Sequence, residues 1–218
     1  DPMSSISHLV GLSIFGLLGP VLIWRGRGSW SRMAWLMVLY LSTEMLLAMS
    51  MTYHMLEPGG FSREEVLRRL DHAAIFVLIA GTITTVHGIL FSGWRRWLII
   101  LLLWMFVAAA VPLKMVFFHE MPEALGLGLY LGFGWVGLFS GFLLYRRYGF
   151  KFILLVLYGG LAYSIGAVAE FVDWPVVVPG VFGPHEFFHL AVLAGLALHW
   201  WFIWQFADGS VTRDQTQP

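Results

Sequence analysis

The 218-residue chain contains no cysteine. Disulfide bonds and thiolate metal ligands are therefore excluded, and any metal ion must be held by His, Asp or Glu side chains. Charged residues are also scarce, at 12% against about a quarter in soluble domains, whereas 59% of the residues are hydrophobic. The formal net charge is zero, which gives no reason to expect a nucleic-acid or acidic partner. This composition indicates a membrane protein with several spans.

Seven apolar runs along the chain are long enough to cross a bilayer, and polar loops rich in Arg, Gly or Pro separate them. The first run has no basic segment before it and no small-residue cleavage site, so we expect a retained span. No internal repeat marks a second domain. We predict an all-α fold, a single seven-helix membrane domain over residues 1–218, with spans at roughly 8–24, 33–55, 71–91, 96–117, 125–145, 152–170 and 184–206.

Lys and Arg residues are unequally shared between the two ends of this predicted bundle. Nine lie in loops at the end that carries the C-terminus, and four lie at the other end. Because Lys and Arg are enriched in cytoplasmic loops, the count predicts an N-terminus outside and a C-terminus inside. The chain changes sides of the membrane at each crossing, so it is on the same side after two crossings and after six. The end of span two and the starts of spans three and seven therefore share one end of the bundle.

The clearest motif is an H-E-x-x-H string at 185–189, of the kind found in zinc peptidases. Two histidines four residues apart face the same side of a helix and can bind one metal ion. A zinc peptidase needs a third ligand, and the only carboxylates downstream are Asp208 and Asp214. Asp208 lies about 28 Å beyond His189 along a continuous helix, on the other side of a membrane. The peptidase interpretation is therefore a minority option, and a catalytic role for Glu186 is possible but not required.

More polar residues fall at the same end of the bundle. Span two ends with Ser50 and His54, and span three begins with Asp71. Three histidines and one open position are typical of catalytic zinc, so we predict a Zn²⁺ site with ligands His54, His185 and His189. Asp71 and Ser50 are the candidate catalytic residues. Asp71 would accept a hydrogen bond from a metal ligand or a proton from the bound water, and Ser50 would hydrogen-bond the water, the carboxylate or a substrate oxygen. Alternatively, Asp71 simply caps span three.

Other polar residues have simpler interpretations. His87 and His199 are expected to be interfacial residues with their polar tips among lipid head groups. Glu170 and His119 lie in loops or at a helix end, where a solvated side chain is the simplest interpretation. Glu44 lies inside span two and is expected to pair within the bundle, although the sequence identifies no partner.

Span five is rich in glycine. Small residues allow the backbones of neighbouring helices to approach closely, and we take this packing role as the default. A groove that admits a lipid chain between helices is the alternative. The glycines concerned are Gly126, Gly128, Gly132, Gly134 and Gly137.

Three motifs in order resemble the haemolysin III branch of the progestin and adipoQ receptor (PAQR) superfamily. They are S-M-T-Y-H at 50–54, R-L-D-H-A-A-I-F-V-L-I-A-G-T at 69–82 and H-E-F-F-H-L-A-V-L-A-G-L-A-L-H at 185–199. The resemblance extends over all seven spans. It implies a seven-helix fold with a zinc ion held by the three histidines already named, and with Asp71 and Ser50 at the same site.

The same resemblance suggests an activity, since the superfamily is distantly related to alkaline ceramidases. It implies a metal-dependent hydrolase of membrane lipid amides with a role in membrane homeostasis, located in the bacterial inner (cytoplasmic) membrane. The partner expected is a membrane lipid, as substrate or ligand, and not nucleic acid. Two alternatives stay open: a non-enzymatic sensor or receptor with a structural zinc, and a haemolysin-type protein that disrupts membranes.

Overall fold

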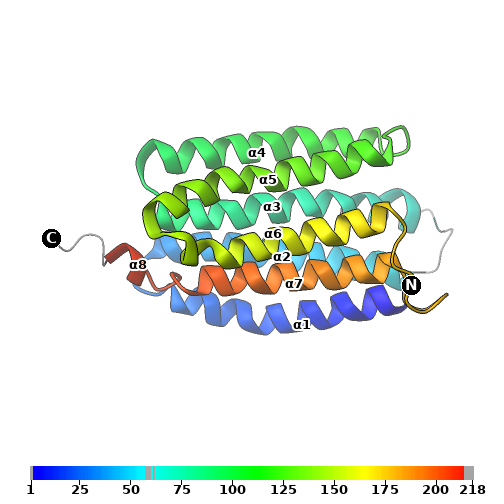
Figure 1. Cartoon of the computed structure of the whole chain (residues 1–218), viewed down its shortest axis with the longest axis horizontal. Helices are drawn as coiled ribbons and strands as arrows, with labels where there is room; N and C mark the ends of the chain where they lie inside the picture. The colour runs from blue at the N-terminus through cyan, green and yellow to red at the C-terminus, as the bar shows by residue number, and fades with distance from the viewer. Residues whose placement is uncertain (1, 57–59, 61, 214–218) are drawn as a thin grey trace.

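The computed structural model describes residues 2–56, 60 and 62–213, with only the backbone described at 62–64 and 212–213. Part of the predicted polar connection between spans two and three, at 57–59 and 61, lies outside this range, as does Asp214. Within the described residues, seven helices are long and apolar enough to cross a membrane (Figure 1). The predicted all-α, seven-helix membrane fold is confirmed.

Most helices begin before the apolar run that predicted them, because polar residues at the membrane surface continue the first helical turn. A π-helical turn, η1 (Ser62–Leu67), leads into the third long helix, and the short α8 (Ser210–Arg213) follows the last. The long helices are α1 (Pro2–Arg25), α2 (Trp30–Met55), α3 (Arg68–Leu90), α4 (Gly93–Val116), α5 (Glu123–Tyr148), α6 (Phe150–Phe171) and α7 (Pro184–Trp204).

Local residues explain several of these boundaries. At the start of α2, the Ser29 hydroxyl accepts a hydrogen bond from the Arg32 N–H at 3.4 Å, as an N-cap residue does. Between α5 and α6, Gly149 has φ 86°, a left-handed conformation that lets the chain reverse with a single linking residue. At the start of α7, Pro184 occupies the first helical turn, where its missing N–H costs nothing.

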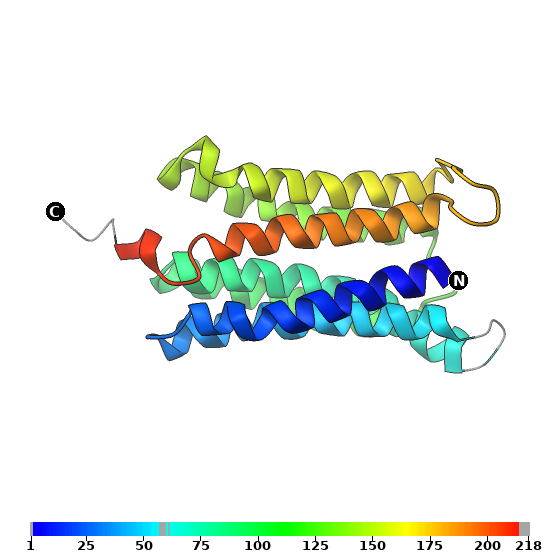
Figure 2. The ribbon, with the colours of Figure 1, turned by 90° about the horizontal axis from the view of Figure 1, so that it is seen from below.

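The helices lie side by side along the long axis of the molecule (Figures 1 and 2). Along the chain, α1 packs against α2, α2 against α3, and α3 against α4; likewise α5 packs against α6, and α6 against α7. Two further contacts join these groups, because α7 packs against α1 and α5 packs against α3. The helix α3 is the most enclosed, with 78% of its apolar stretch buried, against at most 39% in the others. The start of α1, the end of α2, the start of α3 and the α4–α5 and α6–α7 connections lie at one end, and α8 lies at the other (Figure 1).

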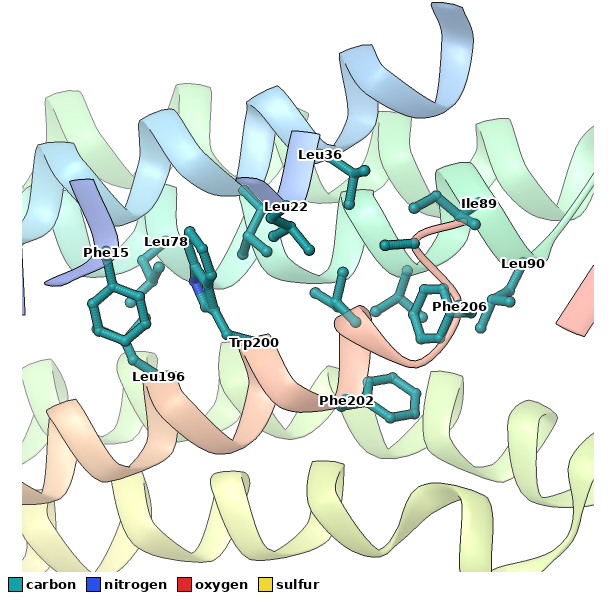
Figure 3. Close-up of a cluster of buried hydrophobic side chains, with 14 of the residues drawn as sticks. Phe15, Leu22, Leu36, Leu78, Ile89, Leu90, Leu196, Trp200, Phe202 and Phe206 are labelled. Atoms are coloured by element: carbon teal, nitrogen blue, oxygen red, sulfur yellow. The ribbon is translucent and has the colours of Figure 1, made fainter. Parts of the chain in front are cut away.

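The largest buried cluster joins α7 to α1, α2 and α3 (Figure 3). Phe15 of α1 packs against Trp200 of α7 with ring centroids 4.8 Å apart. The Trp200 indole N–H donates a hydrogen bond to the Thr43 hydroxyl of α2 at 3.1 Å, so its polar atom is satisfied inside the bundle. These contacts fix α7 relative to α1 and α2 and hence set the positions of residues at the ends of these helices.

The prediction that His87 and His199 are interfacial was wrong. His87 is fully buried, and its Nε2 lies 2.8 Å from the Ser140 hydroxyl of α5. The Nε2 of His199 lies 3.2 Å from the Val156 carbonyl oxygen of α6. Neighbouring helices supply hydrogen-bond partners for both rings, and such partners cannot be identified from the position of a histidine along its own span.

Candidate metal centre

Three histidines from two helices meet at the end of the bundle that carries the N-terminus. They are His54 in the last turn of α2 and His185 and His189 in the first two turns of α7. Each histidine offers one ring nitrogen as a ligand atom, and these three nitrogens all lie within 4.8 Å of one another. His54 and His189 are buried and His185 is partly exposed, so the group could hold a metal ion with one side open.

The two nitrogen separations that involve His185 fit a tetrahedral zinc ion. The Nε2 atom of His185 lies 3.2 Å from Nε2 of His54 and 3.2 Å from Nε2 of His189. Two nitrogens bound to tetrahedral zinc at about 2.0–2.1 Å would be about 3.3–3.4 Å apart. His185 thus lies at nearly this spacing from each of the other two histidines, and the ligand nitrogens of His54 and His189 lie within 4.8 Å of each other.

Glu170, at the end of α6, determines which nitrogen of His185 carries its proton. Nδ1 of His185 lies 2.8 Å from Oε1 of Glu170, and a carboxylate can only accept, so Nδ1–H is the donor. The Nε2 lone pair is then free to face the other two histidines. A carboxylate in this position is the usual outer partner of a metal-bound histidine. The prediction of a merely solvated Glu170 was wrong, because the loop between α6 and α7 brings His185 back beside its carboxylate.

Asp71 and Ser50 stand beside the three histidines. Asp71 lies in the first turn of α3, where the Ser50 side chain is its hydrogen-bonding neighbour and where it interacts electrostatically with His185. Ser50 is 2% exposed and lies one turn before His54 in α2. The N-cap position of α3 is occupied by Leu67, so Asp71 does not act as its N-cap residue. The structure thus places both predicted catalytic side chains next to the histidines, and their catalytic role stays a prediction.

Glu186, the glutamate of the H-E-x-x-H string, makes hydrogen bonds that hold the start of α7. Oε2 of Glu186 accepts a hydrogen bond from the Gly183 N–H at 2.7 Å and so caps the start of α7. Its other oxygen, Oε1, accepts one from the Ser4 hydroxyl at 3.5 Å. Asp208 lies past the far end of α7, in an ion pair with Arg25 at 3.0 Å. The string therefore lacks the downstream carboxylate ligand of a zinc peptidase within the described residues.

A fourth histidine, which the sequence interpretation missed, packs against this group from α1. His8 is 3% exposed, and its ring centroid lies 4.0 Å from that of His189 with the planes tilted by 36°. Neither ring nitrogen of His8, nor Nδ1 of His189, makes a hydrogen bond within the described part of the chain. Ser4 and Ser5 of the same helix are also buried. The signal was present in the sequence, because Ser4 and His8 are four residues apart at the start of an apolar span.

The remaining ionisable residues singled out from the sequence lie apart from the centre. His119 is exposed, with its Nε2 3.2 Å from Oε1 of Glu65. In α2, Oε1 of Glu44 is buried and has no hydrogen-bond partner among the described residues. A pairing of Glu44 inside the bundle is thus not found in the part of the chain that the structure describes.

A long cavity of about 340 Å³, with mainly apolar walls, runs between α3, α5, α6 and α7. One end is lined by Ile75, Tyr130 and Phe188, and Ile75 and Phe188 lie close in sequence to Asp71 and His189. From Phe188 to Phe202 on α7 the cavity extends about 21 Å along the helix. This is more than half of the roughly 30 Å hydrocarbon core.

Three glycines of α5 line this cavity and make no close helix contact. Gly134, Gly137 and Gly141 line it, and a Cβ atom added to them would meet no heavy atom closer than 3.8 Å. The default interpretation of close packing was therefore wrong for Gly134 and Gly137, two of the five glycines to which it was applied. The geometry supports the alternative, a space between helices.

Similar proteins were found by comparison. A family model described as "Haemolysin-III related" matches residues 1–200, a range that includes all three histidines. "Hemolysin-3" from Bacillus cereus is 31% identical over 135 residues, which cover 62% of this chain and 58% of that protein, less than two thirds of its length. "Hemolysin-3 homolog" from Bacillus subtilis (strain 168) is 27% identical over 203 residues, which cover 89% of this chain and 88% of that protein.

Proposed function

Because the chain belongs to the haemolysin III family, a branch of the PAQR superfamily, we propose that it is a zinc-dependent hydrolase of membrane lipid amides, like the distantly related alkaline ceramidases. The observation that carries this proposal is the position of the three-histidine group. It lies beside a carboxyl and a hydroxyl side chain, and the lining of the apolar cavity begins at Ile75 and Phe188, four residues from Asp71 and one from His189 along the chain. A hydrolase of lipid amides needs both parts, a polar reaction site and an apolar space for the acyl chain.

Each residue of the centre has a part in this proposal. His54, His185 and His189 hold the ion, and Glu170 keeps His185 in the tautomer that can bind it. When bound, zinc would supply a Lewis acid for the scissile carbonyl group and a means of lowering the pKa of water to about 7. Asp71 accepts the proton of the attacking water and passes it to the leaving amine.

Ser50 and the cavity orient the substrate. Ser50 donates its one hydroxyl proton to the Asp71 carboxylate; once Asp71 has taken a proton from water, the hydroxyl can donate instead to the oxygen on which negative charge develops in the transition state. The acyl chain lies along the glycine-lined wall of α5, and its first carbons pass Tyr130 and Phe188 at the end of the cavity near the histidines. This placement puts the amide carbonyl next to the open side of the three-histidine group.

A non-enzymatic sensor with a structural zinc is the second candidate. Its specific support is that the three histidines come from two helices, α2 and α7, which a bound ion would join. The relatives are named as hemolysins, and membrane disruption is therefore a third candidate. We place it last because the helices of this chain are apolar spans and not basic amphipathic surface helices.

An amidase assay distinguishes these candidates. Zinc-loaded protein in lipid nanodiscs is supplied with ceramide, and fatty acid release is measured for the wild type, Asp71→Asn, Ser50→Ala and the control Glu120→Gln. Glu120 is an exposed carboxylate at the same end of the bundle. We expect Asp71→Asn to slow release about 100-fold to 10,000-fold with zinc retained. No release by zinc-loaded wild type from any lipid amide would reject the enzyme, and lysis of erythrocytes without hydrolysis would favour the hemolysin.

We also propose that the protein lies in the bacterial cytoplasmic membrane with its N-terminus and metal centre outside, from the excess of Lys and Arg at the other end. The absence of cysteine makes a direct test simple. In intact cells, a membrane-impermeant maleimide should label Glu120→Cys and not Gly28→Cys. The reverse labelling pattern would place the metal centre in the cytoplasm.

A further inference from the structure

A second cavity lies at the end of the bundle opposite the metal centre. It has a volume of about 370 Å³ and lies between the turn that joins α3 to α4 and the last turns of α5. It is separate from both the histidines and the long apolar cavity. The residues that line it are Phe91, Ser92, Arg95, Leu143, Arg146 and Arg147.

Half of this lining consists of arginine, and none of it is acidic. The carboxylate described at this end of the molecule is Asp208, which is paired with Arg25. Three guanidinium groups around one cavity repel each other, and an anion between them would remove that cost. Guanidinium groups also match phosphate in shape, since their N–H groups form a planar fork that binds two oxygens together.

Neutral donors add to the positive charge. Ser92 is the N-cap residue of α4, yet its side chain makes no capping hydrogen bond, so the hydroxyl is available to a ligand. The first N–H groups of a helix have no partner within the helix and favour an anion placed against them. Arg147 and Arg96 donate hydrogen bonds to the Leu90 and Phe91 carbonyl oxygens at 2.9 and 2.7 Å, which hold the α3–α4 turn in place as a wall of the cavity.

Exposed aromatic side chains place this cavity at the level of the lipid head groups. Trp94 is 70% exposed beside it, and Phe142 and Tyr145 are exposed on the neighbouring turns of α5. Trp and Tyr gather where the hydrocarbon core meets water. A ligand that enters from the side would thus present a phosphate to the arginines and its chains to the outer surface of α4 and α5.

We propose that this arginine cavity binds the phosphate group of an anionic phospholipid, at a site separate from the metal centre. The proposal does not depend on the hydrolase activity. A simpler explanation is that the arginines only set the membrane orientation, as basic residues at a cytoplasmic end do. The two explanations differ in one respect: orientation depends on the number of charges at this end, whereas binding depends on which charges surround the cavity.

Paired variants separate the two explanations. The first removes two charges from the cavity, Arg95→Gln with Arg146→Gln; both side chains are exposed, and neither makes a hydrogen bond described here. The second removes two charges from the same end but outside the cavity, Arg27→Gln with Lys151→Gln. A third, Arg95→Lys with Arg146→Lys, keeps the charge and loses the planar fork. Helical circular dichroism checks that all three fold.

The measurement is a titration of the purified protein with phosphatidylglycerol and with phosphatidylcholine, followed by native mass spectrometry. We expect the wild type and the outside variant to prefer phosphatidylglycerol equally. The cavity variant with glutamine should bind it about tenfold more weakly, and the lysine variant should fall between them. Equal losses in the glutamine variant and the outside variant would overturn the proposal. Equal affinity of the wild type for the two lipids would also overturn it. If the wild type binds inorganic phosphate but shows no preference for phosphatidylglycerol, the cavity is a free-phosphate site and the proposal is again overturned.

Discussion

Nδ1 of His185 on α7 lies 2.8 Å from Oε1 of Glu170 on α6, across the loop that joins the two helices. The two residues are separated by an irregular segment, yet the carboxylate faces the histidine on the side away from the other two imidazoles. This pair connects α6 to the metal centre and leaves Nε2 of His185 as the atom that can bind an ion.

Replacing Glu170 with Gln should weaken zinc binding. The amide accepts a weaker hydrogen bond from Nδ1–H and can rotate to present a donor instead, so His185 loses its preferred tautomer. We expect zinc affinity to fall about 10-fold to 100-fold, measured by competition with a chelating dye. Glu120→Gln is the matched control and should leave the affinity unchanged. Equal affinities in the Glu170 variant and the wild type would contradict this role.

Replacing His8 tests whether its ring or its nitrogens matter to the centre. His8 contacts the face of His189 and makes no described hydrogen bond, so we expect the flat ring to be what positions His189. His8→Phe should then keep its zinc. His8→Ala leaves a cavity, with an expected loss of about 3–5 kcal/mol of stability and lower zinc occupancy. Zinc content and the melting temperature are measured for both. Loss of zinc in His8→Phe as severe as in His8→Ala would assign the role to a ring nitrogen.

Filling the long cavity should affect lipid substrates and not the metal. Gly141 lines the cavity, and a Cβ atom there has free space around it, so Gly141→Leu projects a side chain into the path proposed for the acyl chain. We expect zinc to be retained and turnover of long-chain ceramide to fall at least tenfold, with short-chain substrates less affected. Gly132→Leu is the control on the same helix, since Gly132 also has free space but does not line the cavity. Similar turnover in the two variants would show that substrate does not use this space.

Asp208 provides a test of the peptidase interpretation and of pH dependence. Partial burial raises the pKa of its carboxyl group, but hydrogen bonds from Ser210 and the charge of Arg25 outweigh this and hold the pKa below its usual value. A carboxyl group with a lowered pKa stabilises the folded state above its unfolded pKa and loses this effect as the pH falls through the folded pKa.

Asp208→Asn should therefore keep full zinc content and lose only about 0–1 kcal/mol of stability at pH 7, since the ion pair with Arg25 is partly exposed. The difference from the wild type should shrink as the pH falls below the ordinary aspartate pKa of about 4 and the wild-type carboxyl group becomes protonated as well. Thermal unfolding across this pH range and metal analysis provide the two readouts. Loss of zinc in this variant would revive an H-E-x-x-H site with a downstream carboxylate ligand.

Much of the fold was predictable from the sequence because membrane spans have a strong, local signal. Apolar length alone identified seven helices. Parity of the crossings then predicted that His54, Asp71 and His185 share one end, without any knowledge of side-chain packing. The structure places these three residues beside each other, as that argument requires.

The parts that were missed depend on contacts between elements. Glu170 was interpreted as solvated because its partner, His185, lies across a loop whose path the sequence does not reveal. His8 lies in a span with no other ionisable residue, and only the packing of α1 against α7 brings it to His189. The glycines of α5 were taken as contact residues because glycine permits both a close approach and an open space, and spacing alone does not distinguish the two.

The central claim is that His54 and the two histidines of α7 bind one zinc ion together. The most direct test is the zinc content of the purified protein, by elemental analysis, for the wild type, His54→Ala, His185→Ala and the buried control His87→Ala, which lies outside the group. We predict about one zinc per chain in the wild type and the control, and none in the other two. Zinc that persists in His54→Ala, or a wild type that binds no zinc when it is supplied, would contradict the account.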